Sequence, residues 1–491
     1  MPSARSIFFS LQTTSFLAIF AAVRLLSYGL SDRPYAQAVL VFIWLCVFGV
    51  VFFRQREYAW LMLLGEIFLG GSGHMLEFFG LSLRTLTVLT FLLLWSFFAV
   101  YERARHRLRI PHALYYLALP LFSIAVFSSG MGISRQHGAG TVIADALPFV
   151  FLALMLPAHH LLERARERET LIRLVLAFLV SSSLLSLFTY AAFVSGVFEL
   201  QDSFYHWFRD VAMGKITPVT PYFYRIVLPE HLLIPPLALV MLSLSMRPGR
   251  LQTLWRVLYA LGSLVLVLNF SRGYFLGLIA GALILKYRHR LLPWLKETAL
   301  AALVLVGILA ALNGVASRGQ SFGLEILGFR FASIVEPNIE TSAATRLRLL
   351  RPIRQLIAER PLTGHGFGAS LTYTDPVTYE SVTTRQFDWG YLELAAELGL
   401  IGTGWYLALI ALIVYEITKK IRRSVPAPDW HIGLLSALAS LLVITVTAPA
   451  LTHVFGIVFL ALTIAAVTKP ENLVGDAHAL SERVLGARRP V

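Results

Sequence analysis

Two arginines stand at positions where a strongly apolar chain has little reason to carry fixed charge. Arg272 lies in the break of an apolar hairpin, LVLNFSRGYFLGLIAGALIL, and Arg346 lies in a long polar segment. Arginine keeps its charge at physiological pH and presents a planar fork that binds phosphate oxygens in pairs. Two such groups at one membrane boundary suit a substrate with a diphosphate head and a lipid tail.

The elements that must position these arginines are membrane-spanning helices. Of the 491 residues, 57% are hydrophobic and 14% are charged, and the mean hydropathy is +0.70. Too little polar surface remains to solvate a soluble globule. The apolar stretches have about the 20 residues that a helix needs to cross roughly 30 Å of hydrocarbon. We therefore expect an all-α polytopic membrane protein with about fourteen transmembrane helices. The expected spans lie near residues 10–30, 36–53, 58–76, 83–101, 112–130, 141–160, 172–195, 230–246, 255–270, 273–286, 297–314, 389–417, 431–447 and 453–468.

The formal charge of +14 does not indicate a nucleic-acid-binding protein. The basic residues are scattered in short loops and are not interleaved with aromatic residues that could stack on bases. Loops rich in lysine and arginine stay in the cytoplasm, and with the expected spans the basic loops share one side. These loops are 102–109, 163–173, 247–256, 286–296 and 419–423. Both termini are therefore expected in the cytoplasm, with Arg272 and Arg346 on the opposite side.

The chain divides into a transmembrane domain, residues 1–469, and a polar cytoplasmic tail, residues 470–491. The N-terminal apolar run lacks a small-residue cleavage site, so we expect an uncleaved first span. The domain includes a large outer loop, residues 315–388, which is too long for a simple connector. We expect it to fold as a helical periplasmic cap. The single cysteine, Cys46, excludes a disulfide within the chain, and we expect it to be a buried apolar filler.

The outer loop contains an amphipathic segment and a glycine-rich turn. The segment that begins near Arg346 places apolar residues such as Leu349 and Ile353 on one side. It ends in the turn Gly364-His365-Gly366-Phe367-Gly368, whose backbone N–H groups are suited to an anion. Asp388 then precedes the next span. This order places an arginine, an expected anion-binding turn and a carboxylate in one loop.

The order of these motifs resembles the O-antigen ligase and O-antigen polymerase superfamily of bacterial envelopes. The elements are the SRG at the hairpin break, the Thr-Arg helix followed fifteen residues later by P-L-x-G-x-G-x-G, and Y-L-x-L-x-x-E-L-G-L-I-G. Residues 70–95 and 225–231 also resemble segments of exopolysaccharide-polymerase members. The resemblance covers roughly residues 60–420.

The resemblance implies a metal-independent glycosyltransferase without a cofactor. Its substrate would be an undecaprenyl-diphosphate-linked oligosaccharide at the periplasmic face of the bacterial inner membrane. The family residues that match Arg272 and Arg346 bind or neutralise the diphosphate. Ligases usually carry His-Asn where this chain has Asp388-Trp389, which favours a polymerase of O-antigen or exopolysaccharide repeat units. The alternative is a ligase that transfers glycan to lipid A core. A chain-length regulator and a flippase are the expected pathway partners.

Transfer from a glycosyl diphosphate develops negative charge on the leaving phosphate, and the acceptor hydroxyl must lose a proton. The candidate catalytic residues are Arg272, Arg346 and Asp388, with Asp388 as the first candidate base. His365, Glu230 and His231 are further candidates for the base. The expected substrate-binding residues are Arg225, His231, Ser271, Gly364, His365, Gly366 and Tyr391. No metal ligands are expected.

Each candidate has a structural alternative. Arg272 could extend its side chain to the membrane interface, and Arg346 could belong to a solvated helix face. Asp388 could cap the next helix, and His365 could lie on a loop surface. A transporter or flippase is the alternative from another class, although such proteins often carry related halves and no internal repeat is evident here. The residues leave open the sugars, the linkage, the acceptor and the oligomeric state.

Overall fold

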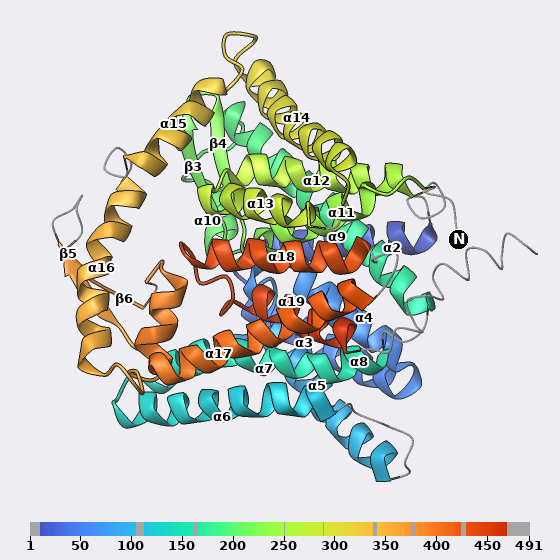
Figure 1. The fold of residues 1–491 in the computed structure, drawn as a ribbon, viewed down its shortest axis with the longest axis vertical. Coiled ribbons are helices and arrows are strands. Elements are labelled where there is room, and N and C mark those ends of the chain that lie inside the picture. Colours follow the sequence, from blue (N-terminus) through green and yellow to red (C-terminus); the bar gives the residue numbers. More distant parts are fainter. Residues whose placement is uncertain are drawn as a thin grey trace, which may run out of the picture.

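The computed structural model describes residues 10–104, 112–161, 165–249, 251–287, 289–336, 341–374, 380–385, 387–423 and 429–468. The predicted tail, residues 470–491, lies outside this part of the chain. The described residues are mostly helical, as expected, and many of the helices run side by side as a bundle (Figure 1).

The first half of the chain contains α2 (Leu11–Gly29), α3 (Pro34–Arg54), α4 (Arg56–Leu69), η1 (Gly71–Gly73), β1 (Glu77–Phe78), β2 (Leu81–Ser82), α5 (Leu83–Ala104), α6 (His112–Ser134), α7 (Ala139–Val150), η2 (Phe151–Leu154), α8 (Met155–Leu161), α9 (Ala165–Val194), α10 (Ser203–Asp210), β3 (Lys215–Thr220), β4 (Phe223–Val227), η3 (Pro229–Leu233) and α11 (Ile234–Ser245). The second half contains α12 (Gln252–Asn269), α13 (Arg272–Leu285), α14 (Leu291–Ala316), α15 (Leu324–Val335), α16 (Thr341–Glu359), β5 (Leu371–Thr374), β6 (Ser381–Thr384), α17 (Gly390–Arg423), α18 (Asp429–Thr445) and α19 (Val454–Val467).

Eight helices among the described residues are long and apolar enough to cross a membrane, and five shorter apolar helices accompany them. The expected number of about fourteen spans is therefore not confirmed. The expected span 58–76 shows one reason. Its helix, α4, ends at Leu69 after 14 residues, and the chain continues as the short turn η1 and the hairpin β1–β2. Glycines with positive φ at Gly70, Gly71 and Gly73 stop the helix at this point.

The long polar loop folds into α15, α16 and an antiparallel hairpin of β5 with β6. The two helices lie at one end of the bundle, on the left of Figure 1. The strands were not expected; they pair from Leu371 with Thr384 to Thr374 with Ser381. On α16, Leu349 and Ile353 are buried against a small core that includes Phe387, so the predicted amphipathic helix is correct. The periplasmic location of this cap stays a prediction.

A stripe of glycines packs α13 closely onto α18. Gly273, Gly277 and Gly281 recur every four residues along α13. A Cβ atom on Gly277 would lie 2.7 Å from Ser440 Oγ, and one on Gly281 would lie 2.9 Å from the carbonyl oxygen of Ser436. Small residues at this spacing let two helix backbones approach each other in a membrane. The stripe therefore fixes where Arg272, the first residue of α13, lies relative to α18.

Polar contacts gather several basic loops at one end of the bundle. Arg422 Nε donates to the Tyr287 hydroxyl at 3.4 Å, so the end of α17 contacts the segment after α13. Arg247 Nη1 lies 3.5 Å from Asp429 Oδ2, so the end of α11 contacts the start of α18. The arginines of these loops thus share one end of the bundle, as the positive-inside pattern predicts. The compartment that this end faces stays a prediction.

Cys46 lies on the exposed surface of α3. The expectation of a buried filler is therefore wrong. The neighbouring Val47 and Val50 are also exposed, because no helix among the described residues covers this apolar face of α3. A run as uniformly apolar as α3 gives no periodic signal from which the buried face could be told.

Candidate functional site

The break between α12 and α13 carries Arg272 at the start of a helix. Phe270 adopts a left-handed backbone conformation with φ 49° and ψ 40°, which is unusual for an aromatic residue. Its ring packs against Phe223 at 5.4 Å and Phe275 at 5.7 Å between centroids, and this packing holds the strained residue in place. The half-buried Arg272 side chain thus lies at the positive end of the α13 dipole, where anions bind.

Arg225 reaches the same break from β4. Its Nε donates to the carbonyl oxygen of Asn269 at 2.7 Å. Asn269 ends α12, three residues before Arg272, and is 1% exposed. The structure therefore brings two of the predicted residues, Arg225 and Arg272, to one short stretch of chain.

His231 lies beneath the break and is completely buried. Its Nδ1 accepts from the side-chain amide of Asn269 at 3.1 Å, and its Nε2 lies 3.4 Å from Ser186 Oγ. The neighbouring Glu230 is also completely buried, 3.8 Å from Arg24 Nη2. This burial favours a positioning role for His231 over the predicted contact with substrate, which stays untested.

Arg330 is a third arginine at the break, and sequence reasoning did not single it out. Its guanidinium carbon lies 5.7 Å from the centroid of the Phe270 ring. Arg330 belongs to α15, in the part of the long loop that carries no motif. Only the folding of this loop back onto the hairpin break reveals the contact. Arg225, Arg272 and Arg330 together make the break strongly cationic.

Arg346 and Asp388 form an ion pair, with 3.6 Å between Nε and Oδ2. The Trp389 indole Nε1 donates to the carbonyl oxygen of Arg346 at 2.9 Å. Asp388 therefore binds the side chain of Arg346, and Trp389 binds its backbone. The two charged side chains are 28% and 44% exposed, which leaves both within reach of a ligand. Asp388 precedes α17 by two residues and has φ 58°. Its carboxylate pairs with Arg346 rather than capping the helix.

The two arginine-bearing stretches border the same end of α18. A Cβ on Gly273 would lie 2.8 Å from Thr447 Oγ1, and a Cβ on Gly390 would lie 2.8 Å from the carbonyl oxygen of Ala448. Because Thr447 and Ala448 are adjacent, the two glycines pack against the same short segment at the end of α18. Arg272 directly precedes Gly273. The hairpin break and the start of α17 therefore form one region, which we call the site end of the bundle.

Two other predicted residues also lie at the site end. Ser271 is half-buried beside Arg272, and its side chain makes no capping bond to α13. Tyr391, in the first turn of α17, donates its hydroxyl to the carbonyl oxygen of Leu442 at 2.8 Å. This bond ties α17 to α18, so Tyr391 has a structural partner whether or not it also contacts substrate.

The glycine-rich turn uses its backbone N–H groups within the protein. Those of Gly364, His365, Gly366, Phe367 and Gly368 donate, respectively, to the carbonyl oxygens of Arg360, Ala396, Glu397 and Ser128 and to the carboxylate of Asp145. The turn therefore joins α6, α7, α16 and α17. It offers none of these N–H groups to an anion here, and the predicted substrate contacts of Gly364 and Gly366 remain without support from this geometry.

His365 is held by the helix that precedes the turn. Its Nε2 donates to the carbonyl oxygen of Leu356 at 2.8 Å, so the neutral ring keeps Nδ1 as an acceptor. Burial lowers the pKa of His365 below its ordinary value, and the nearby Arg135 and Arg360 act in the same direction. The ring is therefore neutral at neutral pH, as a base would have to be.

Carboxylates on α7 and α17 brace the start of α17. Glu393 accepts the N–H of Phe387 at 3.2 Å, which fixes the residue before Asp388. Glu397 shares a side-chain hydrogen bond with Asp145, and Asp145 also holds the N–H of Gly368 at 3.0 Å. Both glutamates belong to the Y-L-E-L-A-A-E-L-G motif. Their spacing of four residues on one helix face was a signal that could have revealed them.

Comparison with known proteins agrees with the motif order. Residues 257–407 match the family model described as O-Antigen ligase. The matched range contains the hairpin break, the entire long loop and the first part of α17, and therefore Arg272, Arg346 and Asp388. A search of curated proteins finds no match to the chain.

Proposed function

We propose that this chain is a membrane glycosyltransferase of the O-antigen ligase and polymerase type, because residues 257–407 match the O-antigen ligase family model. The observation that carries the proposal is that two separate segments next to these arginines pack against the same end of α18. Gly273, next to Arg272 at the break, and Gly390, two residues after the Asp388 that pairs with Arg346, both pack at the end of α18. Guanidinium groups from separate elements suit the two phosphates of a lipid-linked diphosphate.

The donor diphosphate binds between these groups. One phosphate takes Arg272, Arg225 and the N-terminus of α13, and the other takes Arg346. A partly exposed ion pair such as Arg346 with Asp388 stabilises by about 0–1 kcal/mol. A multiply charged diphosphate therefore displaces the Asp388 carboxylate from Arg346. Donor binding thus frees the carboxylate next to the sugar that will react.

The transfer step then balances without a further reactant. The acceptor hydroxyl oxygen forms a bond to the anomeric carbon, and the bond from this carbon to the phosphate oxygen breaks. The electron pair of that bond goes to the leaving diphosphate, where the arginines stabilise the growing charge. Asp388 takes the proton of the hydroxyl. We propose that the arginines supply this charge stabilisation without a metal ion, and activity that withstands EDTA is the expected result.

A polymerase is the preferred form of the proposal. The ligases that this chain resembles usually carry His-Asn, whereas this chain has Asp388-Trp389. Here the aspartate engages the Arg346 side chain and the tryptophan engages the Arg346 backbone, which supports a site organised differently from the histidine of ligases. The acceptor would then be a second undecaprenyl-diphosphate-linked repeat unit at the periplasmic face of the inner membrane.

The experiment is transfer by the purified protein in liposomes that contain undecaprenyl-diphosphate-linked repeat units. The polymerase proposal predicts a ladder of longer glycans on the carrier without added lipid A core. A product formed only when lipid A core is supplied would establish the ligase alternative. Movement of the glycan across the bilayer with no new glycosidic bond would refute the transferase and favour a flippase.

A further inference from the structure

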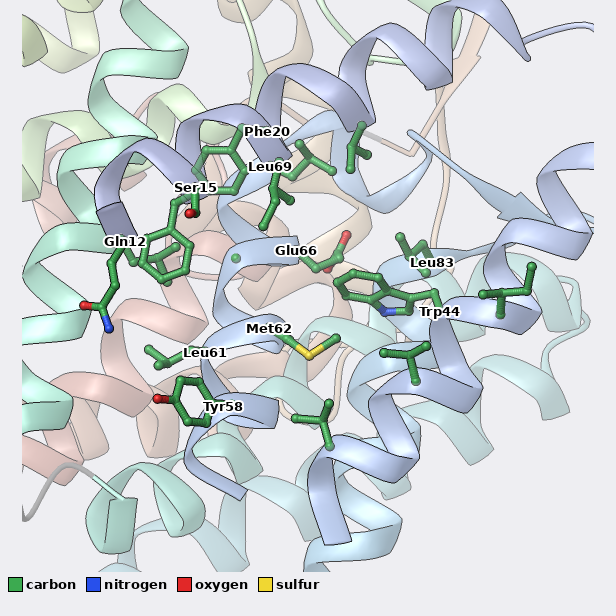
Figure 2. Close-up of a pocket in the computed structure, with 18 of the residues that line it drawn as sticks. Gln12, Ser15, Phe20, Trp44, Tyr58, Leu61, Met62, Glu66, Leu69 and Leu83 are labelled. Atoms are coloured by element: carbon green, nitrogen blue, oxygen red, sulfur yellow. The ribbon is translucent and has the colours of Figure 1, made fainter. Parts of the chain in front are cut away.

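An apolar groove runs along the N-terminal helices, away from the arginines described above. Its walls come from α2 and α3 and its floor from α4, and its volume is about 900 Å³ (Figure 2). Residues from all three helices line it, including Phe16, Ile19, Val47, Leu61 and Met62. α2 packs on α9 whereas α3 packs on α4 and α5. The two walls thus rest on different helices, and the space between them remains open.

Glu66, a residue of α4, lies in the floor of the groove (Figure 2). It is 4% exposed, and its Oε2 lies 3.3 Å from Arg84 Nε. Because Arg84 balances its charge, Glu66 leaves no net charge in the floor of the groove. The middle of the groove therefore suits a hydrocarbon chain, because no water is available inside the bilayer to solvate an unpaired polar group.

One end of the groove is polar. Gln12, Arg54, Gln55 and Tyr58 line this end, whereas Leu26, Leu76 and Leu83 line the other. Arg54 is exposed, and within the described part of the chain it forms no recorded ion pair or hydrogen bond. An exposed guanidinium at the mouth of an apolar groove is complementary to a lipid phosphate.

The polar mouth faces away from the site end. The opposite end of α4 meets the network beneath the hairpin break, because Gly70 packs directly against the carboxylate of Glu230. The 14 residues of α4 rise about 20 Å along the helix axis. A lipid whose phosphate lies at Arg54 therefore has its head near the other membrane boundary. It cannot present a diphosphate to Arg272 and Arg346 at the same time.

We propose that the groove binds one phospholipid of the leaflet at the Arg54 end. Its phosphate pairs with Arg54 and takes a hydrogen bond from Gln12 or Tyr58, and its acyl chain lies along α4 between Ile19 and Val47. The chain fills the space that the packing of α2 and α3 leaves open. The lipid thus joins α2 to the rest of the bundle and is a structural ligand, distinct from the donor substrate.

Val47→Trp tests the apolar part of the site. Val47 lines the groove and is 48% exposed, whereas Val39 on the same helix is 58% exposed and does not line it. The protein and both tryptophan variants are purified from vesicles of phosphatidylethanolamine and phosphatidylglycerol, and bound lipid is counted by native mass spectrometry. We expect one retained phospholipid in the wild type and Val39→Trp, and none in Val47→Trp. Equal retention in all three would overturn the proposal.

Arg54→Glu tests the polar part without filling the groove. The matched control is Arg33→Glu, which reverses an exposed arginine at the opposite end of α3. Loss of a favourable cation and gain of repulsion should weaken phospholipid retention at least about fivefold, and the control should not. Titration with undecaprenyl phosphate is the second arm. Displacement of phospholipid by this carrier at equal concentration, or an unchanged retention in Arg54→Glu, would reject the proposal.

Discussion

Arg346 Nε lies 3.6 Å from Asp388 Oδ2, and this pair joins the long loop to the start of α17. The same carboxylate is the candidate base and the same guanidinium is a candidate phosphate ligand. The two side chains therefore remain paired until a more highly charged ligand binds Arg346. A diphosphate that takes Arg346 releases Asp388, and this exchange couples donor binding to activation of the acceptor.

Replacement of Arg346 should remove transfer with little effect on folding. We expect Arg346→Ala to lower the transfer rate by about 100-fold or more, because a charge-stabilising donor is lost. Arg346→Lys should also be poor, since lysine keeps the charge but not the fork. Arg354→Ala is the control, as Arg354 is exposed on the same helix. Rates measured in liposomes decide the matter, and near-normal product from Arg346→Ala would remove this arginine from the site.

Asp388→Asn distinguishes the role of Asp388 as a base from its role as the ion-pair partner of Arg346. The amide cannot accept the proton of the acceptor, so transfer should fall by about 100-fold or more. It also carries no charge to hold Arg346, so binding of undecaprenyl diphosphate should be unchanged or tighter. A rate and a binding constant measured on the same preparation provide this comparison. Weaker carrier binding together with a normal rate would show that Asp388 is not the base.

Asn269 should matter although it is buried beneath the break. Its carbonyl oxygen holds Arg225 and its amide holds His231. Asn269→Ala leaves His231 without this donor, and a lost buried partner costs about 1–3 kcal/mol. We expect a rate loss of roughly tenfold to 100-fold at saturating donor if the break shifts. A lower Tm with an unchanged rate per folded molecule would mean that Asn269 serves stability alone.

The glycine stripe offers a test of how Arg272 is placed. Gly277→Val adds a Cβ that would lie 2.7 Å from Ser440 Oγ, and such overpacking costs about 1–3 kcal/mol. Gly307→Val on α14 is the control, because nothing lies within 4 Å of a Cβ there. Thermal unfolding in detergent should show a lower Tm for the first variant alone. Equal Tm values would contradict the close packing of α13 on α18.

His365 should give the protein a pH-dependent stability. Its pKa is lowered in the folded protein from the ordinary 6.5, so below pH 6.5 the unfolded chain binds more protons than the folded chain. The contribution of His365 is therefore intact above pH 6.5 and is lost as the pH falls through the lowered value. His365→Gln should flatten the dependence of Tm on pH in this range. An identical pH profile for the variant would refute this assignment.

Local pattern was enough to predict several structural features around the candidate site. Arg272 follows from a charge in an apolar hairpin, and α16 follows from its apolar spacing, with Leu349 and Ile353 buried as expected. The start of α17 beside Asp388 was also predicted. These features depend on neighbours along the chain, so periodicity and residue type carry the information.

Other features depend on contacts between distant segments. Arg330 reaches the break only because α15 folds back onto it. The N–H groups of Gly366 and Phe367 are taken by Glu397 and Ser128, and no local rule indicates that such acceptors are near. The type of His231 suggested a reactive group, but the residue is buried by η3 and its neighbours. The sequence around His231 does not reveal this burial. Two of the unexpected elements, β5 and β6, are short strands. Their pairing depends on the turn between them and on the surrounding contacts.

The most direct test of the account is the affinity of the purified protein for undecaprenyl diphosphate without added metal. Arg272 begins α13, which packs on α18, and Arg346 pairs with Asp388, just before α17 begins at the same end of α18; both arginines should contribute to this affinity. We predict that the double variant Arg272→Ala/Arg346→Ala weakens binding by about 100-fold or more, whereas Arg354→Ala binds normally. Wild-type affinity in the double variant would contradict a diphosphate site formed by these two arginines.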